Sequence, residues 1–215
     1  MPAPSRRGRV SFAAALVFSA VMLGTALLFA VLSECSEAPV ILAIYALFNV
    51  IYSWWGRHVA LVDVFLLSSG YVLRVLLGCA LLGVVSSSWL LLVSSGLAMF
   101  LALAKRRADL VKDLGDQHRV SLSGYNLLFL DQAIGITSAM TVMAYALYCM
   151  EAAVLIPGRE FATLPFVAFG IFDYLRICHV KQTGDSPVDL LLSSPTIMVC
   201  GVGWIMATLW SVRIP

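Results

Sequence analysis

The stretch from Ser11 to Leu32 reads SFAAALVFSAVMLGTALLFAVL and contains no charged residue. An α-helix rises about 1.5 Å per residue, so about 20 apolar residues cross the hydrocarbon core of a bilayer. The apolar core of a cleaved signal peptide is shorter, about 7–15 residues. The stretch is therefore expected to be a retained transmembrane helix.

Six further apolar runs of similar length follow along the chain. The predicted spans are approximately 11–32, 38–55, 61–84, 88–105, 126–150, 161–180 and 195–212. Inside a bilayer each segment must satisfy its own backbone hydrogen bonds, so helices are the expected form. Residues 1–215 are therefore predicted to be one membrane domain, an all-α polytopic bundle of about seven transmembrane helices.

The composition agrees with this prediction. Of the 215 residues, 61% are hydrophobic and 12% are charged, and the mean hydropathy is +0.95. Soluble domains are roughly half apolar and about a quarter charged. The net charge of +2 gives no case for nucleic-acid binding. The five cysteines lack the spacing of a metal site and are expected to be small buried side chains.

Basic residues gather in alternate loops. Arg6, Arg7 and Arg9 precede the first span, Arg57 follows the second, and Lys105–Arg107 follows the fourth. Loops that are rich in Lys and Arg stay in the cytoplasm. This pattern predicts a cytoplasmic N-terminus and an external C-terminus.

Ionisable residues within spans are costly in lipid and are functional candidates by default. From Tyr52 to Arg74 the chain reads YSWWGRHVALVDVFLLSSGYVLR. Asp63 opens the third span, and Arg74 lies about three turns deeper on nearly the same face. Arginine suits phosphate, and Asp oxygens suit Mg²⁺. Together with Arg57, these residues predict an anion or metal–diphosphate site at the cytoplasmic mouth, with helix-packing ion pairs as the alternative.

Three further sets of charged residues leave similar alternatives open. The run Lys105–Arg107 either ends a helix at the cytoplasm or binds phosphate. Asp173 and Arg176, spaced i and i+3, are expected to form a structural pair. Asp131 lies about one turn inside its helix and could reach the same vestibule.

Several motifs in their order and spacing resemble the UbiA superfamily, most closely its decaprenyl-phosphate phosphoribosyltransferase branch. Arg57 stands where that branch has Lys. Further downstream, Ala104–Leu110 resembles its Gly-Lys-Arg-x-Ala-Glu-Leu, and the segments around Tyr148 and Tyr174 also fit. The matching residues of the second signature are Tyr52, Ser53, Arg57, His58, Asp63, Leu73, Arg74 and Gly78.

The resemblance implies a nine-helix bundle in a bacterial-type inner membrane, open to the cytoplasm and to surrounding lipid. It implies Mg²⁺-dependent transfer of 5-phosphoribose from phosphoribosyl diphosphate to polyprenyl (decaprenyl) phosphate, for cell-wall biosynthesis. Asp63 would then be the catalytic and metal-binding carboxylate. The substrate-binding residues would be Tyr52, Arg57, Arg74, Lys105 and Arg106.

The principal Mg²⁺ motif of the superfamily, Asn-Asp-x-x-Asp, does not occur in this sequence. The chain is therefore expected to correspond to a UbiA-like bundle that lacks its first two helices. Four interpretations stay open: the phosphoribosyl transferase, completed by a longer or separate chain; a prenyltransferase that acts on an aromatic acceptor; a non-catalytic remnant or subunit; and a transporter.

Overall fold

The structure is a computed structural model that describes residues 12–33, 35–116, 124–152, 154–181 and 193–212. These residues form helices and turns, with a single β-bridge between Leu155 and Val212. The helices are α1 (Phe12–Leu32), α2 (Ala38–Trp54), the short 3₁₀ helix η1 (Gly56–His58), α3 (Val62–Leu82), α4 (Ser88–Asp116), α5 (Leu127–Glu151), α6 (Leu164–Lys181) and α8 (Pro195–Ser211). The predicted all-α class is confirmed.

The largest difference from the sequence prediction lies in α4. The run was predicted to end at Lys105 and to give way to a loop, whereas the helix continues to Asp116. The extension is rich in residues with good helix propensity, which keep the backbone helical after the apolar pattern stops. The other helix boundaries differ from the prediction by at most three residues.

Local sequence explains how several helices begin and end. Asn126 caps α5, because its side-chain oxygen accepts a hydrogen bond from the Phe129 amide at 2.7 Å. Gly83 ends α3 in the left-handed conformation, with φ +65°, which glycine adopts without steric cost. Pro195 opens α8, where a missing N–H costs nothing.

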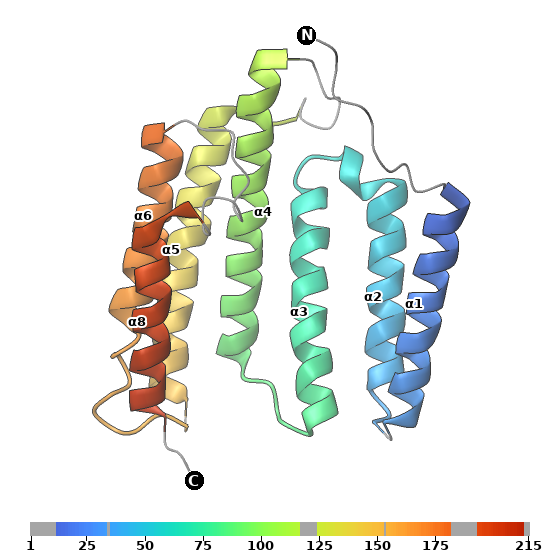
Figure 1. Ribbon diagram of the computed structural model, residues 1–215, viewed down its shortest axis with the longest axis horizontal. Helices are drawn as coiled ribbons and strands as arrows, with labels where there is room; N and C mark the ends of the chain where they lie inside the picture. The colour runs from blue at the N-terminus through green and yellow to red at the C-terminus, as the bar shows by residue number, and fades with distance from the viewer. Residues whose placement is uncertain (1–11, 34, 117–123, 153, 182–192, 213–215) are drawn as a thin grey trace.

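The helices run alternately up and down, and most pack against their neighbours in the sequence (Figure 1). At one end of this row lie α1 and α2, and at the other end lie α6 and α8, which pack against each other. We call the end that carries η1, the start of α3 and the last turns of α4 the basic end; it is uppermost in Figure 1. This end was predicted to face the cytoplasm.

The core lies where α3, α4, α5 and α6 meet. Val64, Leu130 and Ile134 are almost completely buried there, and the rings of Phe100 and Tyr174 meet edge to face at 5.2 Å. Such aromatic pairs add about 0.5–1.5 kcal/mol beyond area burial. This packing holds α4 at a fixed rotation, which the candidate site requires.

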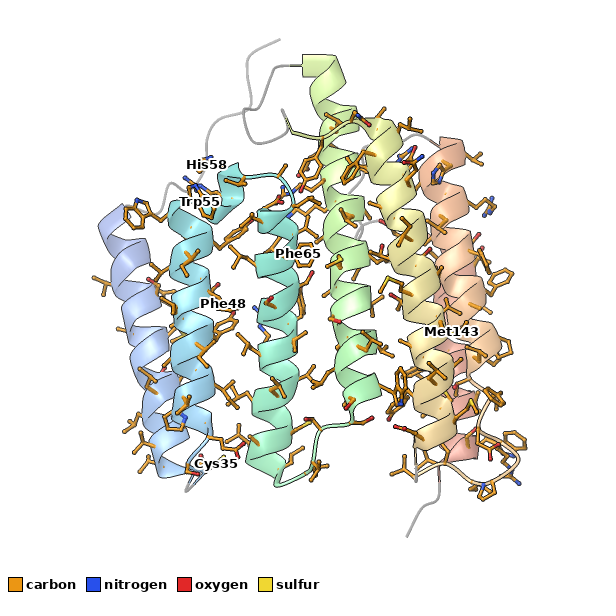
Figure 2. All side chains as sticks on the ribbon, turned by 180° about the vertical axis from the view of Figure 1, so that it is seen from behind. Cys35, Phe48, Trp55, His58, Phe65 and Met143 are labelled. Carbon is orange, nitrogen blue, oxygen red and sulfur yellow. The ribbon has the colours of Figure 1, made fainter. Side chains whose placement is uncertain are left out.

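The outer faces are apolar, as expected for a protein surrounded by lipid. Phe65 and Met143, labelled in Figure 2, are both more than half exposed. Exposed Trp54 and Trp55 lie near the basic end. Trp210 lies at the opposite end of the bundle, where its ring centroid is 4.2 Å from the guanidinium carbon of Arg159. Tryptophan favours the two membrane–water interfaces.

Length and composition support a membrane location. In the described part of the chain, the helical segments Val62–Leu82, Ser88–Lys112 and Leu127–Glu151 are long and apolar enough to cross a bilayer. Shorter apolar helical segments are Val17–Leu32, Ala38–Trp54 and Pro195–Ser211. The predicted membrane helix bundle is confirmed in class, and the number of seven spans stays a prediction.

Candidate functional site

The centre of the candidate site is the carboxylate of Asp63, in the first turn of α3. This residue is 2% exposed. Its Oδ1 accepts hydrogen bonds from the Tyr125 hydroxyl at 2.7 Å and from the Val64 amide at 2.8 Å. Its Oδ2 lies 2.6 Å from Nε of Arg106. The position at a helix N-terminus also favours a negative charge.

Tyr125 connects this carboxylate to a strained backbone. Its hydroxyl accepts a hydrogen bond from the Leu61 amide at 2.6 Å. Leu61 has φ +68° and ψ −44°, close to the strained γ-turn. Such a conformation costs on the order of 1–3 kcal/mol and persists where its surroundings hold it. Burial, and next the hydrogen bond to Asp63, raise the pKa of Tyr125 above its usual 10.0, so the hydroxyl remains a donor.

Arg106 brings α4 to the same carboxylate. Its Nε–H is not aligned with Asp63, so their contact is an ion pair rather than a directed hydrogen bond. Its Nη2 donates to the Tyr52 hydroxyl, and its Nη1 to Asp109, both at 3.4 Å. We call Tyr52, Asp63, Arg106 and Tyr125 the mouth cluster. Three of its four members were predicted from the sequence.

The neighbouring Arg107 points to the other half of the bundle. Its Nε lies 2.5 Å from Oδ1 of Asp131 on α5, and its Nη1 donates to the Cys178 carbonyl of α6 at 3.0 Å. His179 approaches the same Asp131 oxygen at 3.4 Å. Asp131 therefore pairs on the opposite side of α4 and does not join the mouth cluster.

Two predicted phosphate ligands, Arg57 and Lys105, are exposed at the basic end. Arg57 donates to Nε2 of His58 at 3.0 Å. Within the described ranges, neither residue forms an ion pair with a carboxylate. Both side chains are exposed to an anion that arrives from the solvent.

Arg74 lies apart from the mouth cluster, between α2 and α3. Its Nη2 donates to the Tyr45 hydroxyl at 2.6 Å, and its guanidinium carbon lies 5.2 Å and 4.9 Å from the ring centroids of Tyr45 and Tyr71. A pocket of about 140 Å³ opens beside it. We call this pocket the α2–α3 slot; it is lined by Tyr45, Phe48, Asn49, Tyr52, Leu66, Leu67, Gly70, Tyr71 and Arg74.

The sequence analysis identified neither Tyr45 nor Tyr125 as a site residue. Tyr45 stands in an otherwise apolar run. A lone tyrosine in a span gives no signal of its partner, because the hydroxyl's position depends on how α2 and α3 pack. Tyr125 stands just before the capping residue Asn126, and that position was the available clue.

The mouth cluster does not fit a Mg²⁺ site made from the described residues alone. Both Asp63 oxygens already have partners, one of them a cation, whereas Mg²⁺ requires several oxygen ligands in octahedral geometry. Among the described residues, no group of three His, Cys, Asp or Glu side chains could hold a metal ion. The metal-binding role of Asp63 stays a prediction that this geometry does not support.

A second, apolar pocket of about 360 Å³ lies among α4, α6 and α8, beside Phe100, Tyr174 and Trp204. Close to it, Arg176 donates to Oδ1 of Asp173 at 2.9 Å from Nε and at 2.6 Å from Nη2. The predicted structural pair is therefore confirmed. The residues that line this pocket are mainly apolar.

Comparison with curated proteins finds relatives over most of the chain. A decaprenyl-phosphate phosphoribosyltransferase of Corynebacterium glutamicum is 26% identical over 182 residues, which cover 81% of this chain and 54% of that protein. A Mycobacterium tuberculosis protein of the same name is 25% identical over 190 residues, which cover 86% of this chain and 62% of that protein. An uncharacterized protein of Sinorhizobium fredii is 27% identical over 207 residues, 39% of its own length.

The chain spans about half the length of the curated relatives it matches. No family model matches it. The resemblance to decaprenyl-phosphate phosphoribosyltransferases of the UbiA superfamily is nevertheless confirmed by several curated relatives that cover most of the chain.

Proposed function

We propose that this chain provides the phosphate-binding part of a UbiA-type transferase that moves 5-phosphoribose from phosphoribosyl diphosphate to a polyprenyl phosphate in the membrane. The similarity to relatives named decaprenyl-phosphate phosphoribosyltransferase carries the proposal. The cations Arg57, Lys105 and Arg106, which gather at one end of a membrane bundle, support it.

In this proposal the donor's phosphates bind at the basic end. Arg57 and Lys105 have no carboxylate partner among the described residues and can therefore contact phosphate oxygens directly. Arg106 presents Nη2 to Tyr52 and Nη1 to Asp109, while Asp63 holds its Nε side. Asp63 thereby acts as a positioning residue for a phosphate-binding guanidinium.

The reaction itself is a substitution at the anomeric carbon of the ribose. An oxygen of the acceptor phosphate forms a bond to that carbon as the bond from the carbon to diphosphate breaks. The diphosphate leaves with the bonding electron pair, and cations near its oxygens stabilise the charge that develops there. Mg²⁺ stays a prediction from the resemblance, as do a separate chain that completes the site and the bacterial inner membrane as the location.

The test uses Lys105→Ala and Arg57→Ala, because both side chains are exposed and neither pairs with a described carboxylate, so their removal leaves no buried charge. Purified chain in lipid nanodiscs is given radiolabelled phosphoribosyl diphosphate and decaprenyl phosphate, with Mg²⁺ or with EDTA. Each variant is expected to raise the KM for the donor about 10-fold, because a hydrogen bond to a charged group contributes about 1.5–3 kcal/mol. Arg159→Ala, at the opposite end of the bundle, is the matched control.

The alternatives predict different results. Turnover of a prenyl diphosphate with an aromatic acceptor, without phosphoribosyl transfer, would replace the proposal by prenyl transfer. Labelled lipid that forms only after a second membrane protein is added would identify the chain as one subunit. Donor binding that is equal in wild type and in both variants would refute the assignment of the basic end to the donor.

A further inference from the structure

The α2–α3 slot contains a cation whose charge the described residues do not neutralise. Within the described part of the chain, Arg74 pairs with no carboxylate. Its guanidinium has five N–H donors, and one bond, to the Tyr45 hydroxyl, is present. Arg74 stands in the middle of α3, one of the helices long enough to cross a bilayer. A cation at that depth is costly unless an anion or water accompanies it.

Arg74 is exposed, and two tyrosines restrain its guanidinium. The ring centroids of Tyr45 and Tyr71 lie 5.2 Å and 4.9 Å from its central carbon, and the Tyr45 hydroxyl accepts its Nη2–H at 2.6 Å. These contacts come from two helices, α2 and α3. A cation that contacts two aromatic rings keeps its charge and loses some rotational freedom, so less entropy is lost when an anion binds.

The slot is a different site from the mouth cluster. Arg74 follows Asp63 on α3 by three turns, which is about 16 Å along the axis, and its side chain points back by about one turn. The Arg74 guanidinium therefore lies on the order of 10 Å along α3 from Asp63, the carboxylate that Arg106 contacts. One diphosphate group cannot contact both, although Tyr52 borders both sites.

We propose that the α2–α3 slot binds the phosphate of the lipid acceptor, with Arg74 as the cation that receives it. This inference rests on the proposed function and assigns Arg74 to the acceptor rather than to the donor. The volume of about 140 Å³ fits a tetrahedral anion and the first part of a chain, and is small for a sugar diphosphate. Phe48, Leu66 and Leu67 supply an apolar wall, which suits a lipid better than free phosphate.

The arrangement also places the two substrates relative to each other. Tyr52 closes the upper end of the slot and receives Arg106 from the donor side. An acceptor phosphate on Arg74 would lie deeper in the bundle than the donor, and Tyr52 would border both substrates. Pre-orientation of two reactants in this way contributes to catalysis without any change in their chemistry.

The test measures binding rather than turnover. Native mass spectrometry of the full chain in a neutral detergent is used to titrate farnesyl phosphate, farnesol, inorganic phosphate, phosphatidic acid and phosphoribosyl diphosphate. Arg74→Gln is expected to weaken farnesyl phosphate binding 10- to 100-fold, to the level of farnesol, and to leave binding of phosphoribosyl diphosphate unchanged. Tyr45→Phe should weaken it about 3- to 10-fold, because the guanidinium loses one anchor.

Two controls keep the test decisive. Arg159→Gln removes an arginine at the opposite end and should change nothing. Arg74→Lys keeps the charge but loses the planar fork, so it should bind farnesyl phosphate with intermediate affinity. Thermal unfolding of each variant shows that it is folded before its binding is compared.

Each contrary result has a separate meaning. Loss of donor binding in Arg74→Gln, with farnesyl phosphate unaffected, would assign Arg74 to the donor and overturn this inference while the proposed function stands. Phosphatidic acid or inorganic phosphate that binds as tightly as farnesyl phosphate would overturn the acceptor assignment. Binding of neither substrate by wild type would refute the proposed function itself.

Discussion

At the scale of single residues, the buried carboxylate of Asp63 determines the geometry of the basic end. Its partners come from α3, from α4 and from the segment before α5. Removal of one partner of a buried charge is more damaging than the absence of the whole pair, because the remaining charge loses its solvation. Tyr125 is the partner whose contribution can be measured most cleanly, since its loss leaves the ion pair with Arg106 intact.

Tyr125→Phe is expected to lower the free energy of unfolding by about 1–3 kcal/mol at neutral pH. The Leu61 amide would lose its acceptor, and Asp63 would lose one donor. The measurement is thermal unfolding in detergent, with Tyr148→Phe as the control, because no hydrogen bond of the Tyr148 hydroxyl is found among the described residues. Equal melting temperatures for both variants would contradict the role of Tyr125.

The same tyrosine predicts a dependence on pH. The pKa of Tyr125 is raised in the folded state by burial first and by Asp63 next. Its contribution to stability is therefore fully present below the unfolded value of about 10 and is lost as pH rises through the folded value. Between pH 7 and pH 11, the difference in melting temperature between wild type and Tyr125→Phe should narrow only above pH 10.

The resemblance grouped Tyr52, Asp63 and Arg106 at one site, and the structure brings them into contact, whereas the roles that it implied for them stay predictions. A carboxylate in the first turn of a span signals a site, yet whether it binds a metal or an arginine depends on what α4 presents to it. Arg74 was grouped with the same site because it lies on the same face of α3. The partner that separates it, Tyr45, is determined by tertiary packing.

At the scale of helices, α4 and α5 pack closely at Gly96. A Cβ at this position would lie 2.6 Å from Oγ1 of Thr141. That hydroxyl is itself bound to the Thr137 carbonyl at 2.7 Å, so it cannot move away without loss of a buried hydrogen bond. The absence of a side chain at Gly96 therefore determines how closely the two helices pack.

Gly96→Ala is expected to destabilise the protein by about 1–3 kcal/mol, as overpacking does in a well-filled core. Gly135→Ala on α5 is the matched control, because a Cβ there meets no atom within 4 Å and alanine has the higher helix propensity. Chemical unfolding in mixed micelles provides the measurement. A Gly96→Ala variant as stable as Gly135→Ala would show that α4 and α5 can separate freely.

The helix boundaries were largely predictable, because apolar runs and end signals such as Gly83 and Asn126 mark them directly. The extension of α4 to Asp116 was not predictable, since a charged run at the end of a span fits a loop equally well. Its helical form depends on contacts that hydropathy does not describe: Arg107 is 6% exposed and binds Asp131.

At the scale of the whole molecule, the alternation of helices places η1 and the end of α4 on one side of the bundle and the α3–α4 turn on the other (Figure 1). Exposed tryptophans near both ends agree with two membrane interfaces. The all-α membrane class followed from composition. Composition did not predict which helices enclose the α2–α3 slot, because hydropathy predicts spans but not which spans are neighbours.

The orientation can be tested with single cysteines in a chain whose five natural cysteines are replaced. His58→Cys at the basic end should react with a membrane-impermeant maleimide only after cells are permeabilised. Val85→Cys, at the 93% exposed turn after α3, should react in intact cells. This expectation follows from the excess of Lys and Arg in cytoplasmic loops, and the reverse labelling pattern would place the basic end outside.

The adjacent arginines of α4 restrict how the length of this helix can change. Arg106 and Arg107 differ by about 100° around the axis, and they bind opposite halves of the bundle. One residue inserted earlier in α4 would turn both away from their partners at once. The loops at either end could lengthen without that effect. Insertions and deletions are therefore tolerable between the spans but not within this one, where the residue count itself is constrained.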